Sequence, residues 1–126
     1  MTILAILAGA LALSSPPPVV RYVADQFGPI LATPKQQALY TWNAERDFKI
    51  HCTGACAKAW PPLIVKPKAL VTTHVRGIAG TLGTVRRPDG RLQVTFNRRP
   101  VYTYAHERPA QVLCDNVDGW FVVRLR

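Results

Sequence analysis

The feature that most constrains this chain is a pair of similar segments within its 126 residues. Residues 39–60 read LYTWNAERDFKIHCTGACAKAW, and residues 101–120 read VYTYAHERPAQVLCDNVDGW. Placed over one another without a gap, the segments align Tyr40 with Tyr102, Trp42 with Tyr104, Glu45 with Glu107 and Cys52 with Cys114. After a short slip, Trp60 aligns with Trp120. This self-similarity predicts a domain of two related halves, with repeats over about residues 28–65 and 84–123.

Turn-forming residues favour short strands over long helices. The chain has 11 prolines and 8 glycines, and both residue types interrupt helices. Residues 81–97 read TLGTVRRPDGRLQVTFN, in which the PDG sequence predicts a tight hairpin turn. The alternation of Leu92, Val94 and Phe96 predicts a half-buried antiparallel strand. We therefore expect one mainly β domain over residues 19–126, a small antiparallel sheet or barrel-like fold with at most short helical turns.

Other elements are predicted on either side of this hairpin. Strands are expected over residues 19–25, 30–33 and 38–43, and GWFVVRLR closes the chain as a last strand. Residues 53–60 predict one helical turn with Thr53 as its N-cap, ended by the prolines that follow. Residues 66–80 are expected to connect the two halves.

The repeated segments carry a family resemblance. The sequences LYTW-NAE, CTGACAKAWPPL and GTVRRPDGRLQVTFNRRPVYTY, and the late GW pair, resemble the secreted-repeat family of predicted bacterial lipoproteins of unknown function. Its Tyr-x-aromatic-x-x-Asp motif is matched with Glu45 and Glu107 in place of Asp, and the match runs from near Gly28 to Val123. The resemblance implies a small, exported, mainly β domain, and it brings no established activity.

The N-terminus predicts export. Residues 3–13, ILAILAGALAL, are apolar and are followed by two serines and three prolines. This run is too short to span a bilayer but suits a secretory signal, so residues 1–18 are expected to be a signal peptide with a Pro-rich junction. We expect a periplasmic or secreted protein with no transmembrane helix in the mature chain. A lipid anchor is not expected, because no lipobox cysteine follows the apolar run.

The cysteines allow several arrangements. Cys52 and Cys56 lie close enough in sequence for a disulfide, which small exported domains commonly use. Because the closed loop is so short, it would contribute little more than ~2 kcal/mol to stability. A redox-active pair is the alternative, although the spacing is not C-x-x-C. Cys114 makes the count odd, so it is either buried and reduced, paired with Cys52, or cross-linked to a second molecule.

A metal site is another possibility for the same region. His51, Cys52, Cys56, His106 and Cys114 include thiol and imidazole ligands that suit copper or zinc, so a copper or haem-related redox accessory protein is one alternative function. Adjacent strand residues point to opposite faces, which argues against a single ion held by both His51 and Cys52. No cofactor is predicted.

The aligned aromatic residues have two interpretations. Alternate positions of a strand share one face, so the rings pack together either as the seam between the halves, with Trp60 and Trp120, or as a shallow platform for sugar or lipid. The aligned acids, Glu45 and Glu107, would pair with nearby arginines such as Arg46 and Arg108, or cap turns. No phosphate-binding loop or nucleophile elbow appears in the sequence, and we expect no enzymatic activity.

The chain is strongly basic, with a formal net charge of +9. Such a charge attracts polyanions, although solvated charges also simply keep a protein soluble. The candidate polyanion-binding residues are Arg86, Arg87, Arg91, Arg98 and Arg99. No nucleic-acid-binding motif accompanies them, so nucleic acid is not the expected partner. We expect an exported, non-enzymatic binding or structural module of the bacterial cell envelope, whose partner is another envelope protein or an anionic polymer.

Overall fold

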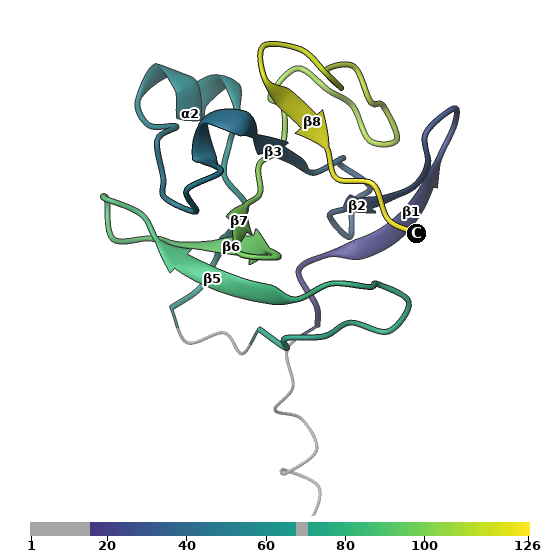
Figure 1. Ribbon diagram of the computed structural model, residues 1–126, viewed down its shortest axis with the longest axis horizontal. Coiled ribbons are helices and arrows are strands. Elements are labelled where there is room, and N and C mark those ends of the chain that lie inside the picture. The colour runs from purple at the N-terminus through teal and green to yellow at the C-terminus, as the bar shows by residue number, and fades with distance from the viewer. Residues whose placement is uncertain (1–15, 68–70) are drawn as a thin grey trace, which may run out of the picture.

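The protein is mainly β and is built from small antiparallel sheets, as the sequence predicts. The computed structural model describes residues 16–67 and 71–126, so most of the predicted signal peptide lies outside the described residues (Figure 1). The elements in chain order are β1 (Val20–Ala24), β2 (Gly28–Ala32), β3 (Tyr40–Trp42), the 3-10 helix η2 (Asn43–Glu45), α2 (Ala55–Ala59), β4 (Ile64–Val65), β5 (Leu82–Arg86), β6 (Leu92–Phe96), β7 (Arg99–Pro100) and β8 (Trp120–Val122).

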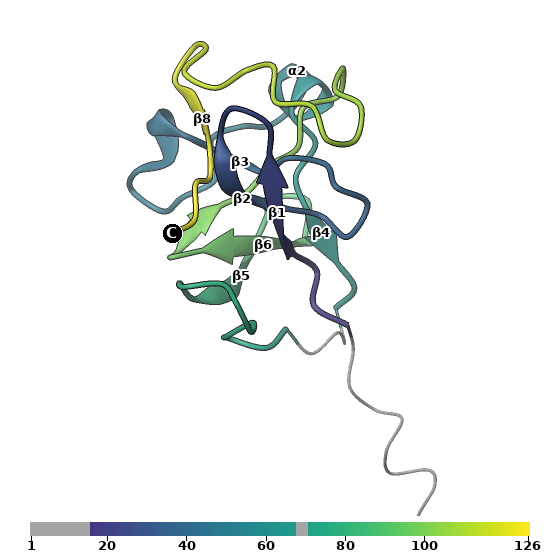
Figure 2. The same cartoon turned by 90° about the vertical axis from the view of Figure 1, so that its right-hand side faces the viewer.

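Two hairpins provide the longest strands. β1 pairs with β2, and β5 pairs with β6, both antiparallel and each over five residues. The PDG turn closes the second hairpin, and Gly90 takes the φ of 88° that a side chain would resist. β4 and β7 also pair with β6, so β6 is the centre of its sheet. In both views β5 and β6 lie below β3 and β8 (Figure 1, Figure 2).

The central strands connect segments that are far apart in sequence. β3 pairs with β8, which brings the C-terminal strand beside the first of the two similar segments. Tyr40 and Tyr102 form an antiparallel bridge, in which the Tyr40 N–H donates to the Tyr102 carbonyl at 2.8 Å and the Tyr102 N–H donates to the Tyr40 carbonyl at 3.0 Å. Tyr102 also bridges Pro62. The two aligned tyrosines are therefore adjacent at the middle of the molecule.

Two expectations about local structure are wrong. β6 is not half-buried, because Gln93 is 0% exposed and Thr95 is 6% exposed, alongside the buried Val94. One face of the strand packs in an aliphatic group through Val94 and Phe96, and on the other face the buried Arg87 donates to the Gln93 side chain. Thr53 is not the N-cap of α2; Gly54 occupies that position, and no side chain caps the helix. Neither helix among the described residues is long and apolar enough to cross a membrane.

The core divides into two groups of side chains. One contains both aligned tyrosines and both aligned tryptophans, together with Cys52. The other is aliphatic and lies around β6, with Leu39, Leu82 and Val94 among its members. Val19 is 0% exposed, so the packed domain begins at or before this residue. The aligned tyrosines and tryptophans among the candidate functional residues therefore belong to the first core.

Candidate functional site

The aligned tyrosines and glutamates form two crossed hydrogen bonds. The Tyr102 hydroxyl donates to Glu45 Oε2 at 2.8 Å. The Tyr40 hydroxyl donates to Glu107 Oε2. Each tyrosine therefore binds the acid of the other segment rather than the acid that follows it in sequence. All four residues are buried, so these bonds tie the two segments together inside the molecule.

Each glutamate also holds the loop that follows it. Glu45 Oε2 accepts hydrogen bonds from the backbone N–H of His51 at 2.6 Å and of Cys52 at 2.9 Å. Glu107 Oε2 accepts one from the N–H of Leu113 at 2.8 Å, the residue that aligns with His51. Backbone donors and a tyrosine thus bind Oε2 of each carboxylate, which offsets part of the cost of burying it. Oε1 of each carboxylate has no hydrogen-bond partner among the described residues.

The expected pairing of these acids with arginine is wrong. The ion pairs among the described residues join Asp47 with His51, Asp89 with Arg91, and Asp115 with Arg124, and none of them includes Glu45 or Glu107. The alternative expectation, that the acids cap turns, is closer to the structure, because both accept loop N–H groups. The sequence identified the acids but not the tyrosines as their partners.

Burial changes the acid–base properties of this group. Desolvation raises the pKa of the Glu107 carboxyl, although the hydrogen bonds from Tyr40 and Leu113 oppose this change. Desolvation also raises the pKa of both tyrosine hydroxyls, and the adjacent carboxylates raise it further. The tyrosines therefore stay protonated and act as hydrogen-bond donors, which is the role that the geometry requires of them.

Aromatic rings fill the space beside the crossed bonds. Trp60 and Trp120 stack with ring centroids 3.9 Å apart and planes 6° apart. Tyr40 meets the Trp60 ring edge-on at 5.2 Å, and Tyr102 meets the Trp120 ring in the same way at 5.2 Å. The rings of Trp42 and Tyr104 add further contacts to the tryptophan stack. The aromatic residues therefore form the seam of the core, and the sugar or lipid platform is not the arrangement observed.

The expected disulfide between Cys52 and Cys56 is present, with Cα atoms 5.2 Å apart. Cys56 lies on α2, so the bond joins this short helix to the loop held by Glu45. Cys114 is free and buried, as in one of the three arrangements considered from the sequence. Because the disulfide occupies the sulfurs of Cys52 and Cys56, neither can serve as a thiolate metal ligand while it is intact.

The remaining metal-ligand candidates lie apart from one another. His51 Nε2 is 2.8 Å from Asp47 Oδ2 on an exposed loop. His106 packs against the ring of Tyr104. Residues 16–67 and 71–126 contain no group of three or more His, Cys, Asp and Glu side chains placed to hold an ion.

Two of the five candidate polyanion-binding arginines face inward. Arg87 is only 4% exposed; its Nη1 donates to Gln93 Oε1 at 2.6 Å and its Nη2 donates to the Cys52 carbonyl at 2.8 Å. Arg99 Nη2 donates to the Trp42 carbonyl at 2.9 Å. The sequence missed the buried Gln93, because its position in an alternating strand predicted a solvated side chain. These arginines stabilise the fold through their bonds to the interior.

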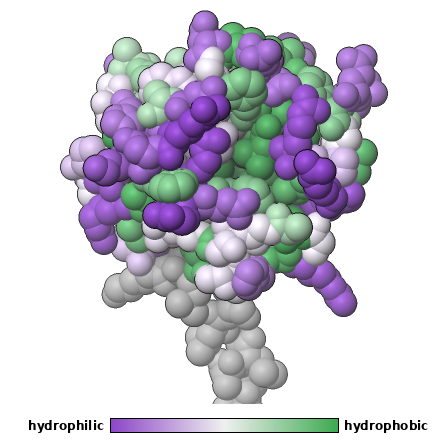
Figure 3. All heavy atoms as spheres, in the orientation of Figure 1, coloured by the Kyte–Doolittle hydropathy of each residue, from purple (hydrophilic) through white to green (hydrophobic). Residues whose placement is uncertain are grey.

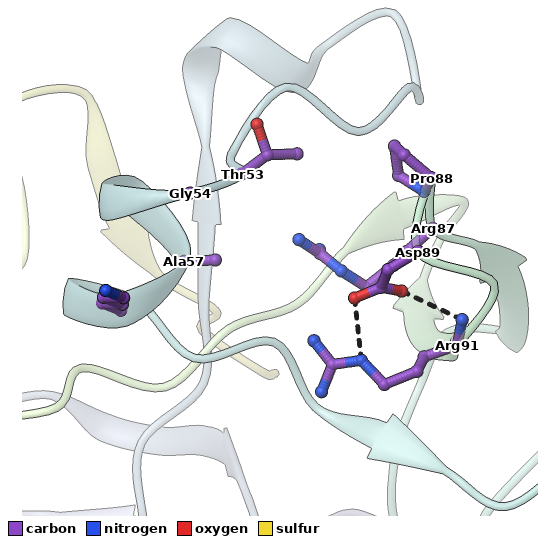
Figure 4. Close-up of a pocket in the computed structure, with 8 residues that line it drawn as sticks. Thr53, Gly54, Ala57, Arg87, Pro88, Asp89 and Arg91 are labelled. Atoms are coloured by element: carbon purple, nitrogen blue, oxygen red, sulfur yellow. Dashed lines mark hydrogen bonds and ion pairs between the residues drawn. The ribbon is translucent and has the colours of Figure 1, made fainter.

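The other three arginines are exposed, and they lie near lysines that were not among the candidates named from the sequence. Arg86, Arg91 and Arg98 line three neighbouring hollows together with Lys49 and Lys58. Figure 4 shows the first hollow, where Arg87 and Arg91 of the β5–β6 turn face Gly54 and Ala57. Lys49 and Lys58 are distant from the arginines in sequence, and only folding brings these residues together.

The chain matches no protein-family model, no curated protein and no solved structure. The fold and the site thus define it by themselves as a small β domain with a disulfide, a crossed pair of tyrosine–glutamate bonds and a basic face.

Proposed function

We propose that this chain is an exported, non-enzymatic binding module of the bacterial cell envelope and a member of the secreted-repeat family. The observation that carries the proposal is the burial of the residues on which the resemblance depends. Tyr40, Tyr102, Glu45 and Glu107 bond to one another in the interior. The motif therefore has a structural purpose, and the activity belongs to the surface that the motif supports.

Matched contacts support the proposal that the two segments are a true repeat. The N–H of Asn43 donates to the Gly119 carbonyl at 2.8 Å, and the N–H of Ala105, which aligns with Asn43, donates to the Ala59 carbonyl at 2.9 Å. The β1–β2 hairpin likewise has the strand lengths of the β5–β6 hairpin. A duplicated unit whose copies exchange contacts accounts for both observations.

The buried acids support a binding rather than a catalytic role. A general acid or base must approach the proton it transfers within hydrogen-bond distance. Glu45 is 0% exposed and Glu107 is 7% exposed, and the hydrogen-bonded oxygen of each accepts from tyrosine and loop backbone. One oxygen of each carboxylate is therefore occupied by the scaffold, and both carboxylates are shielded from solvent.

The disulfide supports export. Bonds of this kind form and persist in oxidising compartments and are rare in the bacterial cytosol. The Cys52–Cys56 bond thus agrees with the apolar N-terminal run, which suits a signal peptide.

Expression of the full chain in a Gram-negative host, followed by fractionation and intact mass measurement, tests this proposal. We expect the protein in the periplasmic or secreted fraction, lacking about the first 14–18 residues and lighter by two hydrogens than its fully reduced form. After unfolding it should present one alkylatable thiol, from Cys114. A cytoplasmic protein with an intact N-terminus and three alkylatable thiols would rule out export.

A further inference from the structure

Three hollows of the molecule adjoin, because each shares lining residues with the next. The first, about 350 Å³ in volume, lies between α2 and the β5–β6 turn (Figure 4). The second, about 420 Å³, shares Arg87 and Pro88 with the first, and the third, about 350 Å³, shares Phe48 and Val85 with the second. We call these three hollows the basic groove.

The groove has a strong excess of positive charge. Its charged lining residues comprise one acid, Asp89, and six bases, namely Lys49, Lys58, Arg86, Arg87, Arg91 and Arg98. Asp89 is already bonded to Arg91, with 2.9 Å between its Oδ2 and the arginine Nε. In Figure 3, hydrophilic side chains gather on the left of the molecule, where Figure 1 places α2 and the β5–β6 turn. A surface with these charges attracts an anion.

Arg87 places a fixed positive charge in the lining of the groove. Its two terminal nitrogens bind Gln93 and the Cys52 carbonyl, so the guanidinium is held by neutral groups. Its Nε has no hydrogen-bond partner among the described residues. Arg87 is buried and forms no ion pair among the described residues, so no carboxylate neutralises its charge directly. Its charge adds to that of the exposed lysines and arginines of the groove.

The fold does not require two of these charges, those of Arg86 and Lys49. The first half of the molecule has Ala24 where the second half has Arg86, since β1 and β5 pair with their partners in the same way. Similarly, Lys49 and Phe48 align with Gln111 and Ala110. Phe48 and Ala110 share the backbone conformation, with φ of 68° and 71°. The matched positions Ala24 and Gln111 occupy similar structure without a basic side chain, so the charges of Arg86 and Lys49 belong to the groove and not to the scaffold.

We propose that the basic groove binds a linear polysaccharide that carries carboxylate groups. This ligand class rests on the proposed export, because an envelope protein meets acidic glycans. Guanidinium groups bind carboxylates in forked geometry, and a groove of three hollows offers successive cations to successive sugars. Single-stranded nucleic acid is disfavoured, because base stacking needs a free aromatic face. Phe48 is the aromatic residue of the lining, and Arg98 covers its ring at 4.1 Å from the centroid.

Binding of the purified, oxidised protein to polygalacturonate, measured by calorimetry at several salt concentrations, tests the proposal. One exposed cation from each hollow is replaced in the variant Lys58→Gln, Lys49→Gln, Arg98→Gln. The control variant, Lys35→Gln, Arg108→Gln, Arg126→Gln, removes the same charge from exposed residues outside the groove. Circular dichroism and thermal unfolding verify that both variants are folded.

We expect the groove variant to bind roughly tenfold or more weakly than wild type, and the control variant to lose less than about threefold. Wild-type affinity should fall as salt rises. Equal losses in both variants, no binding of polygalacturonate, or tighter binding of single-stranded DNA or of a sulfated glycan would each overturn the proposal. Because purified protein is used, failure here is distinct from failure of export.

Discussion

At the scale of single residues, burial and hydrogen bonding have opposite effects on the pKa of Glu107. Its carboxylate accepts from Tyr40 and Leu113, yet desolvation dominates and raises its pKa. A carboxyl with a raised pKa binds its proton more tightly in the folded state than in the unfolded state. Its contribution to the free energy of unfolding is therefore fully present below the unfolded-state pKa, roughly 4.3, and is lost as pH rises through the folded-state pKa.

The variant Glu107→Gln isolates this effect. We expect the advantage of wild type over the variant in free energy of unfolding to shrink as pH rises from about 4 to 7, because only wild type loses a proton-linked contribution there. Urea unfolding of both proteins at each pH measures the difference, in which the other titrating groups cancel. An advantage that grows with pH would show that the carboxylate is more stable folded than unfolded, against the raised pKa.

The residue scale also shows what the sequence could and could not predict. Tyr40, Tyr102, Glu45 and Glu107 were identified as a matched set, because alignment needs only residue identities. The hydrogen-bond partners of these residues were not predicted, since the crossed bonds depend on the antiparallel approach of Tyr40 to Tyr102. Arg87 was expected among the polyanion-binding candidates, and its burial depends on Gln93 and Cys52, which only the fold brings beside it.

At the scale of elements, α2 depends on the disulfide more than on its own residues. The helix spans Ala55–Ala59 only, and no side chain caps it. Isolated helices of this length are unstable in water. The Cys52–Cys56 bond and the hydrogen bonds from the His51 and Cys52 N–H groups to Glu45 hold the segment in place.

The variant Cys56→Ser is expected to lower the free energy of unfolding by about 2 kcal/mol, because it releases the constraint on the unfolded chain. Urea unfolding with and without dithiothreitol measures this. The reductant should destabilise wild type and the control variant Cys114→Ala, which retains the disulfide, but leave Cys56→Ser unchanged. If dithiothreitol has no effect on wild type, the bond does not contribute to stability.

The β5–β6 hairpin was the element best predicted from sequence. The PDG turn and its flanking strands are local features, and β5 and β6 lie where they were expected. The burial of both faces of β6 was not predictable from its alternation, because the Gln93 side chain is buried by its contacts with Arg87 and the Val101 carbonyl. Local patterns therefore located the strand, and tertiary contacts determined its environment.

At the scale of the whole molecule, the two similar segments hold each other through exchanged contacts. Trp60 stacks on Trp120, and each aligned tyrosine bonds to the glutamate of the other segment. The sequence predicted two related halves, with a shared aromatic seam as one of two interpretations of the aligned rings. It could not predict that the polar bonds cross between the halves, because within-half pairing satisfies the same sequence pattern.

A double-mutant cycle on Tyr102 tests the crossed arrangement most directly. Tyr102→Phe is combined with Glu45→Gln in one cycle and with Glu107→Gln in the other, and urea unfolding gives the free energies. The account predicts a coupling of about 1–3 kcal/mol between Tyr102 and Glu45, and additivity within about 0.5 kcal/mol for Tyr102 and Glu107. Strong coupling of Tyr102 to Glu107 with additivity toward Glu45 would contradict it.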